Sequence, residues 1–398
     1  MKREIHRLQV IMIVFLGVLS GMVLSACQGR IRDQHPGAVQ VRIPMYSNNA
    51  YKLQTIELIS IDDMRTLGGW AARFFLSPTL SRGKLVGMQP QINTIRTESG
   101  EYIATDSFSL QLLTLYAHME KLTLLDDELG ISRGDESREP RTVAIKVNMM
   151  SESGQPDSDN ARYNGKLDAF LFAPYLREDL PLTVNAGVIA HEHFHSIFYK
   201  TVIQPLGDKY PGPDGNLHGN DQKLLKHFGF EEAASSENVG LLSERDIYHA
   251  VLLRGLNEGL ADIWGWLYSD DTAFVRRSLP QVEESRTLSS GELKLKSTKE
   301  LRAQAQAYHS WGNSNAVSYE LGSQYGRILF ASLNQFAGDP VKMKEMKKKM
   351  GQKINSALQK MTIHFQSLPG DEMMTTEFFL QQLQVEIPEV KIEYKAAK

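Results

Sequence analysis

The stretch 188–198, VIAHEHFHSIF, contains an H-E-x-x-H pattern made by His191, Glu192 and His195. Residues four positions apart lie on one face of an α-helix, so both histidines can reach one zinc ion. Glu192, next to the first histidine, would then face a water molecule at that ion. His193 projects from a different face, and we expect it to pack or to hydrogen-bond inside the protein. The pattern therefore predicts an α-helix with two metal ligands, and the fold of the chain must bring a third ligand close to that helix.

The third ligand must come from elsewhere in the chain, because a catalytic zinc site has three protein ligands and one position open for water. The best source is the segment 257–262, NEGLAD, within a stretch of helical periodicity, 243–268. Glu258 and Asp262 are four positions apart, so one carboxylate can bind the metal while the other accepts a hydrogen bond from a ligand histidine. Two acidic residues on an apolar helix face would be costly to bury without such partners. This cost favours a functional role for the pair.

Hydrophobic patterns along the chain predict an α+β fold. The chain has 398 residues, 42% of them hydrophobic and 23% charged, which is typical of a globular protein with two or three domains. Alternating or β-branched stretches predict strands at 54–61, 84–96, 142–148 and 163–174, the last turning at Asn164-Gly165. Helical spacing predicts helices at 67–76, 106–129, 183–203, 243–268, 299–307, 319–336, 341–366 and 375–384.

The first residues are typical of a secretory signal, because Lys2, Arg3 and Arg7 precede an apolar run at 8–24. The run ends in Leu-Ser-Ala-Cys, which resembles the lipobox of bacterial lipoproteins, where the cysteine is lipidated and becomes the new first residue. That residue, Cys27, is the only cysteine of the chain. An uncleaved membrane anchor with an incidental cysteine is the alternative, since a run of this length is at the short limit for a membrane span.

A lipid at Cys27 would tether the protein to the membrane of the bacterial cell envelope, with the catalytic domain outside the cytoplasm. Gln28 stands where lipoproteins retained at the inner membrane often carry Asp, so the resemblance favours the outer membrane. The net charge of −3 and the scattered Lys and Arg residues argue against a nucleic-acid partner.

Three stretches together resemble the gluzincin metallopeptidases of the thermolysin-like and fungalysin-like group. Residues 191–195 match the H-E-x-x-H helix, and residues 257–265 match the N-E-x-x-[SA]-D-[IY]-x-G helix. Residues 160–165, NARYNG, resemble the N-A-F-W-N-G stretch of the edge strand that lines the substrate cleft. Their order along the chain is also that of the family, and the resemblance covers about residues 106–267. It implies a zincin-type two-lobe fold, with a mixed sheet and the zinc helix in the N-terminal lobe and a mainly helical C-terminal lobe.

The resemblance also assigns the chemistry to particular residues. His191, His195 and Glu258 would hold one catalytic zinc ion, a ligand set that is known for thermolysin. Glu192 would be the general base that takes a proton from water and passes it to the leaving amine. Asp262 would orient His191.

Other assignments concern the surroundings of the metal. Asn257 would lie in the layer behind the ligands. Asn160 and the backbone of Ala161 would bind an extended peptide as an added strand. Calcium is implied by family analogy only, because the acidic pairs of the chain do not follow a calcium-loop spacing.

The sequence departs from the family in two respects. The family places a His or Tyr beyond the glutamate helix to stabilise the oxyanion, and no recognisable version of that stretch is present. Tyr319 is the first candidate and His309 the second, although either can be a purely structural residue. In addition, 63 residues separate His195 from Glu258, more than in thermolysin. An insertion rich in Gly, Pro, Asp and Asn, 204–242, accounts for this spacing.

These patterns divide the chain into five regions. They are a lipoprotein signal peptide with its lipobox (1–27), a tether with a small accessory region (28–104), an N-terminal catalytic lobe with the edge strand and the H-E-x-x-H helix (105–203), the insertion (204–242), and a C-terminal helical lobe with the third zinc ligand (243–398).

Two functions follow as hypotheses. The first is a zinc metallopeptidase of the cell envelope, an endopeptidase by its resemblance, that acts on peptides or proteins. The alternative is a catalytically inactive lipoprotein that keeps the zincin fold as a binding or scaffold module. A chance H-E-x-x-H on a core helix would require three coincidences in the right order. No pattern indicates the cleavage specificity or the oligomeric state.

Overall fold

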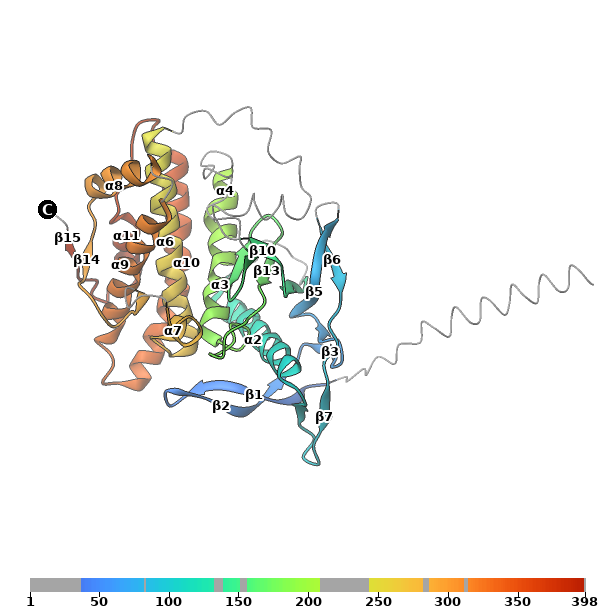
Figure 1. Ribbon diagram of the computed structural model, residues 1–398. Coiled ribbons are helices and arrows are strands. Elements are labelled where there is room, and N and C mark those ends of the chain that lie inside the picture. The colour runs from blue at the N-terminus through green and yellow to red at the C-terminus, as the bar shows by residue number, and fades with distance from the viewer. Residues whose placement is uncertain are drawn as a thin grey trace, which may run out of the picture.

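A computed structural model describes residues 37–81, 84–131, 139–150, 156–207, 243–281, 286–310 and 314–396. The expected signal peptide with Cys27, and most of the expected insertion at 204–242, lie outside these ranges. The described part is a mixed α+β structure, as predicted (Figure 1). None of the helices in these ranges combines the length and the apolar composition of a membrane span.

A five-stranded mixed sheet lies beside the H-E-x-x-H helix. Its strands have the order β12-β13-β9-β5-β6, and β5, β9 and β13 run parallel while the two edge strands are antiparallel to their neighbours. The bounds are Ala72–Ser81 (β5), Lys84–Met88 (β6), Arg141–Ile145 (β9), Ala161–Asn164 (β12) and Ala169–Phe172 (β13). The predicted strand at 142–148 and the predicted pair at 163–174 are therefore confirmed. The first strand of that pair, β12, forms an edge of the sheet.

A second sheet has the order β2-β1-β8-β7 and is built entirely from the region 28–104. The strands β1 (Val39–Ser47) and β2 (Ala50–Leu58) form a hairpin whose two turn residues, Asn48 and Asn49, both have positive φ. This is the conformation that a two-residue hairpin turn requires. The predicted strand at 84–96 is divided, because its first part is β6 and its last part is β7 (Thr94–Arg96), which pairs with β8 (Tyr102–Ala104).

The predicted helix at 67–76 is wrong. Residues 68–69 form the short strand β4 (Gly68–Gly69), and β5 begins at Ala72. A short apolar run cannot be assigned from its pattern alone. The tertiary structure decides here, because β5 pairs with β9 and β6 on its two sides, with Ala72 and Phe74 buried and Arg73 exposed between them. The region expected to be a small accessory part thus supplies two strands of the sheet beside the candidate site.

The helix α2 (Ser107–Leu129) has the ends that its sequence predicts. The Asp106 side chain accepts a hydrogen bond from the Ser109 N–H, and Gly130 adopts the left-handed conformation after the last turn. Most of the helix is buried, and it packs beside α3 (Figure 1).

The H-E-x-x-H stretch lies on α3 (Ala186–Phe198), and each of the 13 residues of this helix is buried. The Asn185 side chain caps its start by accepting hydrogen bonds from the N–H groups of Gly187 and Val188. The helix continues into a turn of π-helix, η1 (Tyr199–Ile203), and a short α4 (Gln204–Leu206). The predicted helix at 183–203 is therefore confirmed, with a wider last turn.

The NEGLAD segment lies in the middle of α6 (Glu244–Ser269), which packs on one side against α3 and on the other against α9 (Ser314–Asn334). The contact with α9 is very close at Gly259, where an added Cβ would lie 2.3 Å from the carbonyl oxygen of Gly322. Glycine at both positions lets the two helix backbones approach, and this approach fixes the depth of α6 in the core.

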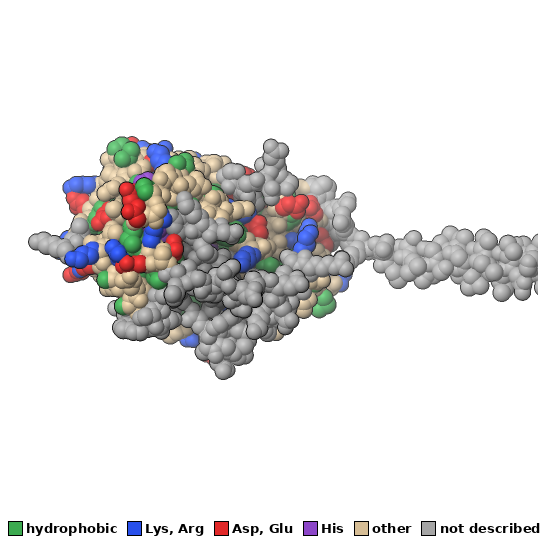
Figure 2. All heavy atoms as spheres, turned by 90° about the horizontal axis from the view of Figure 1, so that it is seen from above, with side chains coloured by type: hydrophobic (Ala, Val, Ile, Leu, Met, Phe, Trp, Pro, Cys, Tyr) green, Lys and Arg blue, Asp and Glu red, His purple; other side chains and the backbone are tan. Residues whose placement is uncertain are grey.

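The remaining helices cover α6 and complete a mainly helical half of the molecule (Figure 1). These helices are α7 (Phe274–Ser278), α8 (Thr298–Ser310), α9, α10 (Pro340–Ser367) and α11 (Phe378–Glu386). The sequence predicted each of them except α7. Short pairs complete the strands: β3 (Ile61–Asp63) with β4, β10 (Met149–Met150) with β11 (Pro156–Asp157), and β14 (Lys294–Leu295) with β15 (Lys395–Ala396). On the face seen in Figure 2, acidic and basic side chains are interspersed.

Candidate metal centre

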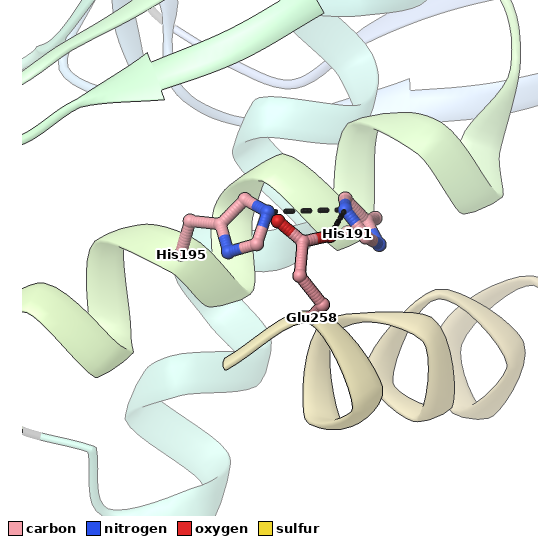
Figure 3. A group of neighbouring side chains, drawn as sticks. All are labelled: His191, His195 and Glu258. Atoms are coloured by element: carbon pink, nitrogen blue, oxygen red, sulfur yellow. Dashed lines mark hydrogen bonds and ion pairs between the residues drawn. The ribbon is translucent and has the colours of Figure 1, made fainter. Parts of the chain in front are cut away.

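Two helices bring three potential ligands together. His191 and His195 extend from successive turns of α3, and Glu258 extends towards them from α6 (Figure 3). The Nε2 atoms of the histidines lie 3.0 Å apart, and His191 Nε2 lies 3.7 Å from Glu258 Oε2. All three side chains are buried, and their ligand atoms lie within 4.8 Å of one another. This group could hold a metal ion.

Each histidine has an acceptor behind it on α6. His195 Nδ1 lies 2.9 Å from Asn257 Oδ1, and His191 Nδ1 lies 3.0 Å from Asp262 Oδ1. Both acceptors are oxygen atoms, so a ring that donates its Nδ1–H to one of them keeps a lone pair on Nε2 for a metal ion. The expected contact between Asp262 and His191 is present. Asn257 was expected to lie behind the ligands, with no particular partner, and it faces His195.

These lone pairs provide a test of whether a metal ion fits. Two Nε2 lone pairs that face each other at 3.0 Å repel unless a cation lies between them. Ligands placed about 2.0–2.1 Å from a tetrahedral ion lie about 3.3 Å from one another. The separations of 3.0 and 3.7 Å bracket that value, so the donor set and its spacing fit a small tetrahedral ion.

Glu192 is held on the sheet side of this group. Its Oε2 accepts a hydrogen bond of 2.8 Å from the backbone N–H of Tyr163 in β12. Burial, opposed by His191 and assisted by the charge of Glu258, raises the pKa of the Glu192 carboxyl to about 7. A carboxylate in this environment can accept and release a proton near neutral pH.

Sequence reasoning did not identify Arg286, which is close to two of the acidic residues. Its Nη2 lies 2.7 Å from Asp262 Oδ1 and 3.6 Å from Glu258 Oε2. Although burial by itself would raise the pKa of Asp262, the charges of Arg286 and His191 lower it to about 2. The sequence indicated this arginine only indirectly, because two buried carboxylates need a cation nearby.

Tyr319, the first candidate for the oxyanion residue, lies in the same cavity as the three ligands, which has a volume of about 160 Å³. The guanidinium groups of Arg254 and Arg286 lie 5.7 and 5.5 Å from the centre of its ring. The charge of Glu258 raises the pKa of the Tyr319 hydroxyl, and the two arginines oppose this increase. Arg254 lies one helical turn before Glu258 and was also not identified from the sequence. The second candidate, His309, belongs to α8, but its side chain lies outside the described part.

The predicted substrate-binding residues line the same cavity. Asn160 and Ala161 form one of its walls, and Ala161 begins the edge strand β12. Along this strand, the Asn160 carbonyl accepts from Ala173 N–H on the side of β13, whereas Tyr163 N–H points to Glu192. Backbone directions alternate along a strand, so the N–H and C=O of Ala161 point to the same side as those of Tyr163, away from β13.

The prediction for His193 is confirmed. Its Nε2 lies 2.8 Å from Asp126 Oδ1 of α2, on the face of α3 opposite the candidate ligands, and the second oxygen of Asp126 accepts from Arg141 at 2.5 Å. This buried network fixes α3 against α2.

The chain matches no protein-family model, and no curated protein sequence matches it at a significant level.

Proposed function

We propose that this protein is a zinc-dependent metallopeptidase of the gluzincin type, anchored to the bacterial cell envelope through a lipid on Cys27. One observation carries the proposal: the His191–His195–Glu258 group, the Glu192 carboxylate and the outer edge of β12 meet in a single cavity. A structural metal site would need neither a carboxylate of raised pKa nor the edge of a sheet beside it.

The architecture around the cavity supports a zincin-type two-lobe fold. The mixed sheet and α3 lie on one side of the candidate site, and α6 with the other C-terminal helices lies on the other side (Figure 1). The order of helix, strand, edge strand, zinc helix and glutamate helix agrees with the family that the motifs resemble.

In this proposal, an extended peptide pairs with the edge of β12 through the N–H and C=O groups of Ala161. Zinc, when bound, supplies a Lewis acid that polarises a carbonyl and activates water at neutral pH. Glu192 accepts the proton of the attacking water and returns it to the leaving amine. The Tyr319 hydroxyl donates a hydrogen bond to the developing oxyanion, and the adjacent arginines favour that negative charge.

The critical experiment compares wild type with Glu192→Gln, which keeps the size of the side chain but removes its ability to accept a proton. We expect both proteins to contain about one zinc per chain, and the variant to cleave unfolded protein at least about 100-fold more slowly. Metal content is measured by mass spectrometry, and cleavage is measured with a fluorescent casein substrate. A zinc chelator should prevent the cleavage of this substrate.

Glu320→Gln is the matched control, because it makes the same exchange beside Tyr319 at a residue that pairs with Lys296. It should leave cleavage unchanged. A fully active Glu192→Gln variant would show that the assigned base is wrong. A wild-type protein that holds zinc but cleaves nothing in a broad peptide library would favour the alternative, an inactive zincin-fold binding module.

A further inference from the structure

The tip of the hairpin formed by β1 and β2 contacts the start of α3, where the candidate zinc helix begins (Figure 1). Tyr46 and Tyr51 lie directly opposite each other in this hairpin, and their ring centres are 5.4 Å apart. The Tyr51 hydroxyl accepts a hydrogen bond of 3.0 Å from the Ala186 N–H and donates one of 3.3 Å to Asn185 Oδ1. A region that was expected to be accessory thus reaches the helix that carries two of the candidate ligands.

Asn185 connects this contact to α7. Its Oδ1 caps α3, and its Nδ2 donates hydrogen bonds to the Phe274 carbonyl at 2.7 Å and to Ser278 Oγ at 2.8 Å. These two acceptors belong to the first and last residues of α7. The Asn185 side chain is buried, so each of its polar atoms needs a partner. One carboxamide therefore joins the start of α3, the hairpin and both ends of α7.

The hairpin also contacts the end of α7 directly. Arg277 Nη2 donates to the Tyr46 hydroxyl at 2.8 Å, and Arg277 Cζ lies 4.8 Å from the centre of that ring. The same guanidinium group pairs with Asp271, in the segment that leads from α6 to α7. A helix of five residues is too short to be stable by itself, so contacts of this kind determine where α7 lies.

The position of α7 is important because this helix forms a wall of the metal cavity, to which it contributes Phe274 and Val275. The ring centre of Phe274 lies 6.3 Å from that of His191, and the ring packs on Gly187, where an added Cβ would lie 2.3 Å from Phe274 Cγ. A shift of α7 would therefore move the wall beside the metal position. Glu192 is held from the sheet side by β12 and would stay in place.

We propose that the hairpin is a clamp that positions α7, and that Tyr51 and Asn185 are positioning residues for the wall of the cavity that contacts the substrate. The inference rests on the proposed peptidase function. The general base and the two ligand histidines are held by other contacts, from β12 and α6. Loosening the clamp should therefore raise KM and leave kcat and the zinc content unchanged.

The experiment compares wild type with two variants. Tyr51→Phe removes only the hydroxyl. Asn185→Asp keeps an oxygen that caps α3 but replaces the Nδ2 donor, so it separates the hold on α7 from the capping of α3. With a fluorogenic peptide that the wild type cleaves, we expect KM to rise about fivefold in Tyr51→Phe, as for loss of one hydrogen bond, and more in Asn185→Asp. The kcat of both variants should stay within about twofold of wild type.

Hydrogen exchange in the metal-free protein gives a second readout, which does not depend on activity. The Leu279 N–H bonds to the Val275 carbonyl at 2.9 Å, and its exchange should become about fivefold faster in both variants. Tyr116→Phe is the matched control, because it removes a buried hydroxyl that pairs at 2.8 Å with Ser60 of the same N-terminal region, and neither residue lines the metal cavity. It should change neither KM nor this exchange.

Three results would overturn the inference. One is exchange at Leu279 that is the same in Tyr51→Phe as in wild type, which would show that the hairpin does not hold α7. Another is faster exchange with an unchanged KM, because the position of α7 would then not affect substrate binding. The third is a fall in kcat at constant KM, which would place the effect at the chemical step. A wild-type protein that cleaves nothing would reject the proposed function separately, since the exchange measurement does not need activity.

Discussion

The orientation of the two candidate ligand histidines depends on the oxygen atoms behind them. Asp262 Oδ1 and Asn257 Oδ1 each face an Nδ1 atom, so the Nε2 lone pairs of His191 and His195 point to the position a metal would take. Losing such a partner normally weakens metal binding strongly, because the partner selects the tautomer of the histidine and orients its ring. Arg286 in turn holds Asp262 ionised. The candidate centre is thus arranged by three residues that would not touch the ion.

Replacing Asn257 by leucine keeps the size of the side chain and removes the acceptor. We expect Asn257→Leu to weaken zinc binding by about 10- to 100-fold, because His195 Nδ1 loses its partner. Competition with a chromophoric chelator measures the affinity. Asn355→Leu, on α10 near Thr201, is the control and should bind zinc as wild type does. Equal affinities for all three proteins would show that Asn257 does not orient His195.

A buried histidine away from the metal site predicts a loss of stability in acid. His249 Nε2 accepts a hydrogen bond from the Met374 N–H, and burial lowers the pKa of this imidazole from 6.5 to about 4. The unfolded chain therefore binds a proton that the folded protein does not, so stability falls as the pH drops below about 6.5 and this loss ends near about pH 4. We expect a contribution of about 2 kcal/mol between about pH 7 and pH 5.

Urea unfolding of His249→Gln and wild type at several pH values tests this expectation. The amide oxygen of glutamine can still accept from Met374 but does not titrate. Excess chelator in all samples keeps both proteins free of metal. The free energy of unfolding of the variant should depend less on pH, and parallel curves for the two proteins would contradict the assignment.

At the scale of elements, α6 connects the two halves of the candidate site. It carries Glu258 and Asp262 towards α3, and on its other side it lies backbone to backbone against α9, which carries Tyr319. The position of α6 between these helices depends on glycines at the α9 contact. The geometry of the metal group is therefore sensitive to packing on the far side of the helix.

Gly259→Ala tests this dependence. An alanine Cβ at this position would lie 2.3 Å from the Gly322 carbonyl oxygen, so α6 and α9 must separate. We expect a loss of about 1–3 kcal/mol in the free energy of unfolding and weaker zinc binding, because Glu258 is the adjacent residue. Gly338→Ala, where an added Cβ meets no atom within 4 Å, is the control. Unchanged stability and zinc affinity in Gly259→Ala would show that the close approach is not required.

At the scale of the whole molecule, the candidate site lies where the mixed sheet and α3 meet the helical half. The edge strand β12 is the part of the sheet that reaches it. The region 28–104 supplies β5 and β6 to the same sheet, so this region is joined to the half of the molecule that contains α3. A tether at Cys27 would thus hold the sheet half of the protein to the membrane surface.

The lipid anchor is tested by expression in a bacterial host with a radiolabelled fatty acid. We expect label in the wild-type protein and its recovery in the membrane fraction, because the Leu-Ser-Ala-Cys stretch resembles a lipobox, which would direct modification of Cys27. Cys27→Ala should carry no label and should not be processed there. Ser25→Thr, a conservative change within the same stretch, is the control and should still be labelled. An unlabelled wild-type protein would favour the uncleaved membrane anchor.

Local patterns in the amino-acid sequence were enough to predict the helices that carry the candidate ligands and the pairing of strands at 163–174. Periodicity and end signals are local properties, as Asp106 and Gly130 show for α2, and the four-residue spacings of His191–His195 and Glu258–Asp262 fix which side chains share a helix face. Spacing alone therefore names the two histidines and the pair of carboxylates, whereas the choice of Glu258 over Asp262 came from the resemblance to the gluzincins.

Which helices and strands contact one another depends on packing in three dimensions, which the local patterns do not encode. The apolar run at 67–76 became a turn and a strand because β5 found partners on both sides, and no local pattern encodes that pairing. For the same reason, the sequence did not predict the roles of Arg286 and Arg254 or the contact of the hairpin tip with α7. Ion pairs and cavities depend on residues far apart in the chain, so packing, and not spacing along the sequence, brings them together.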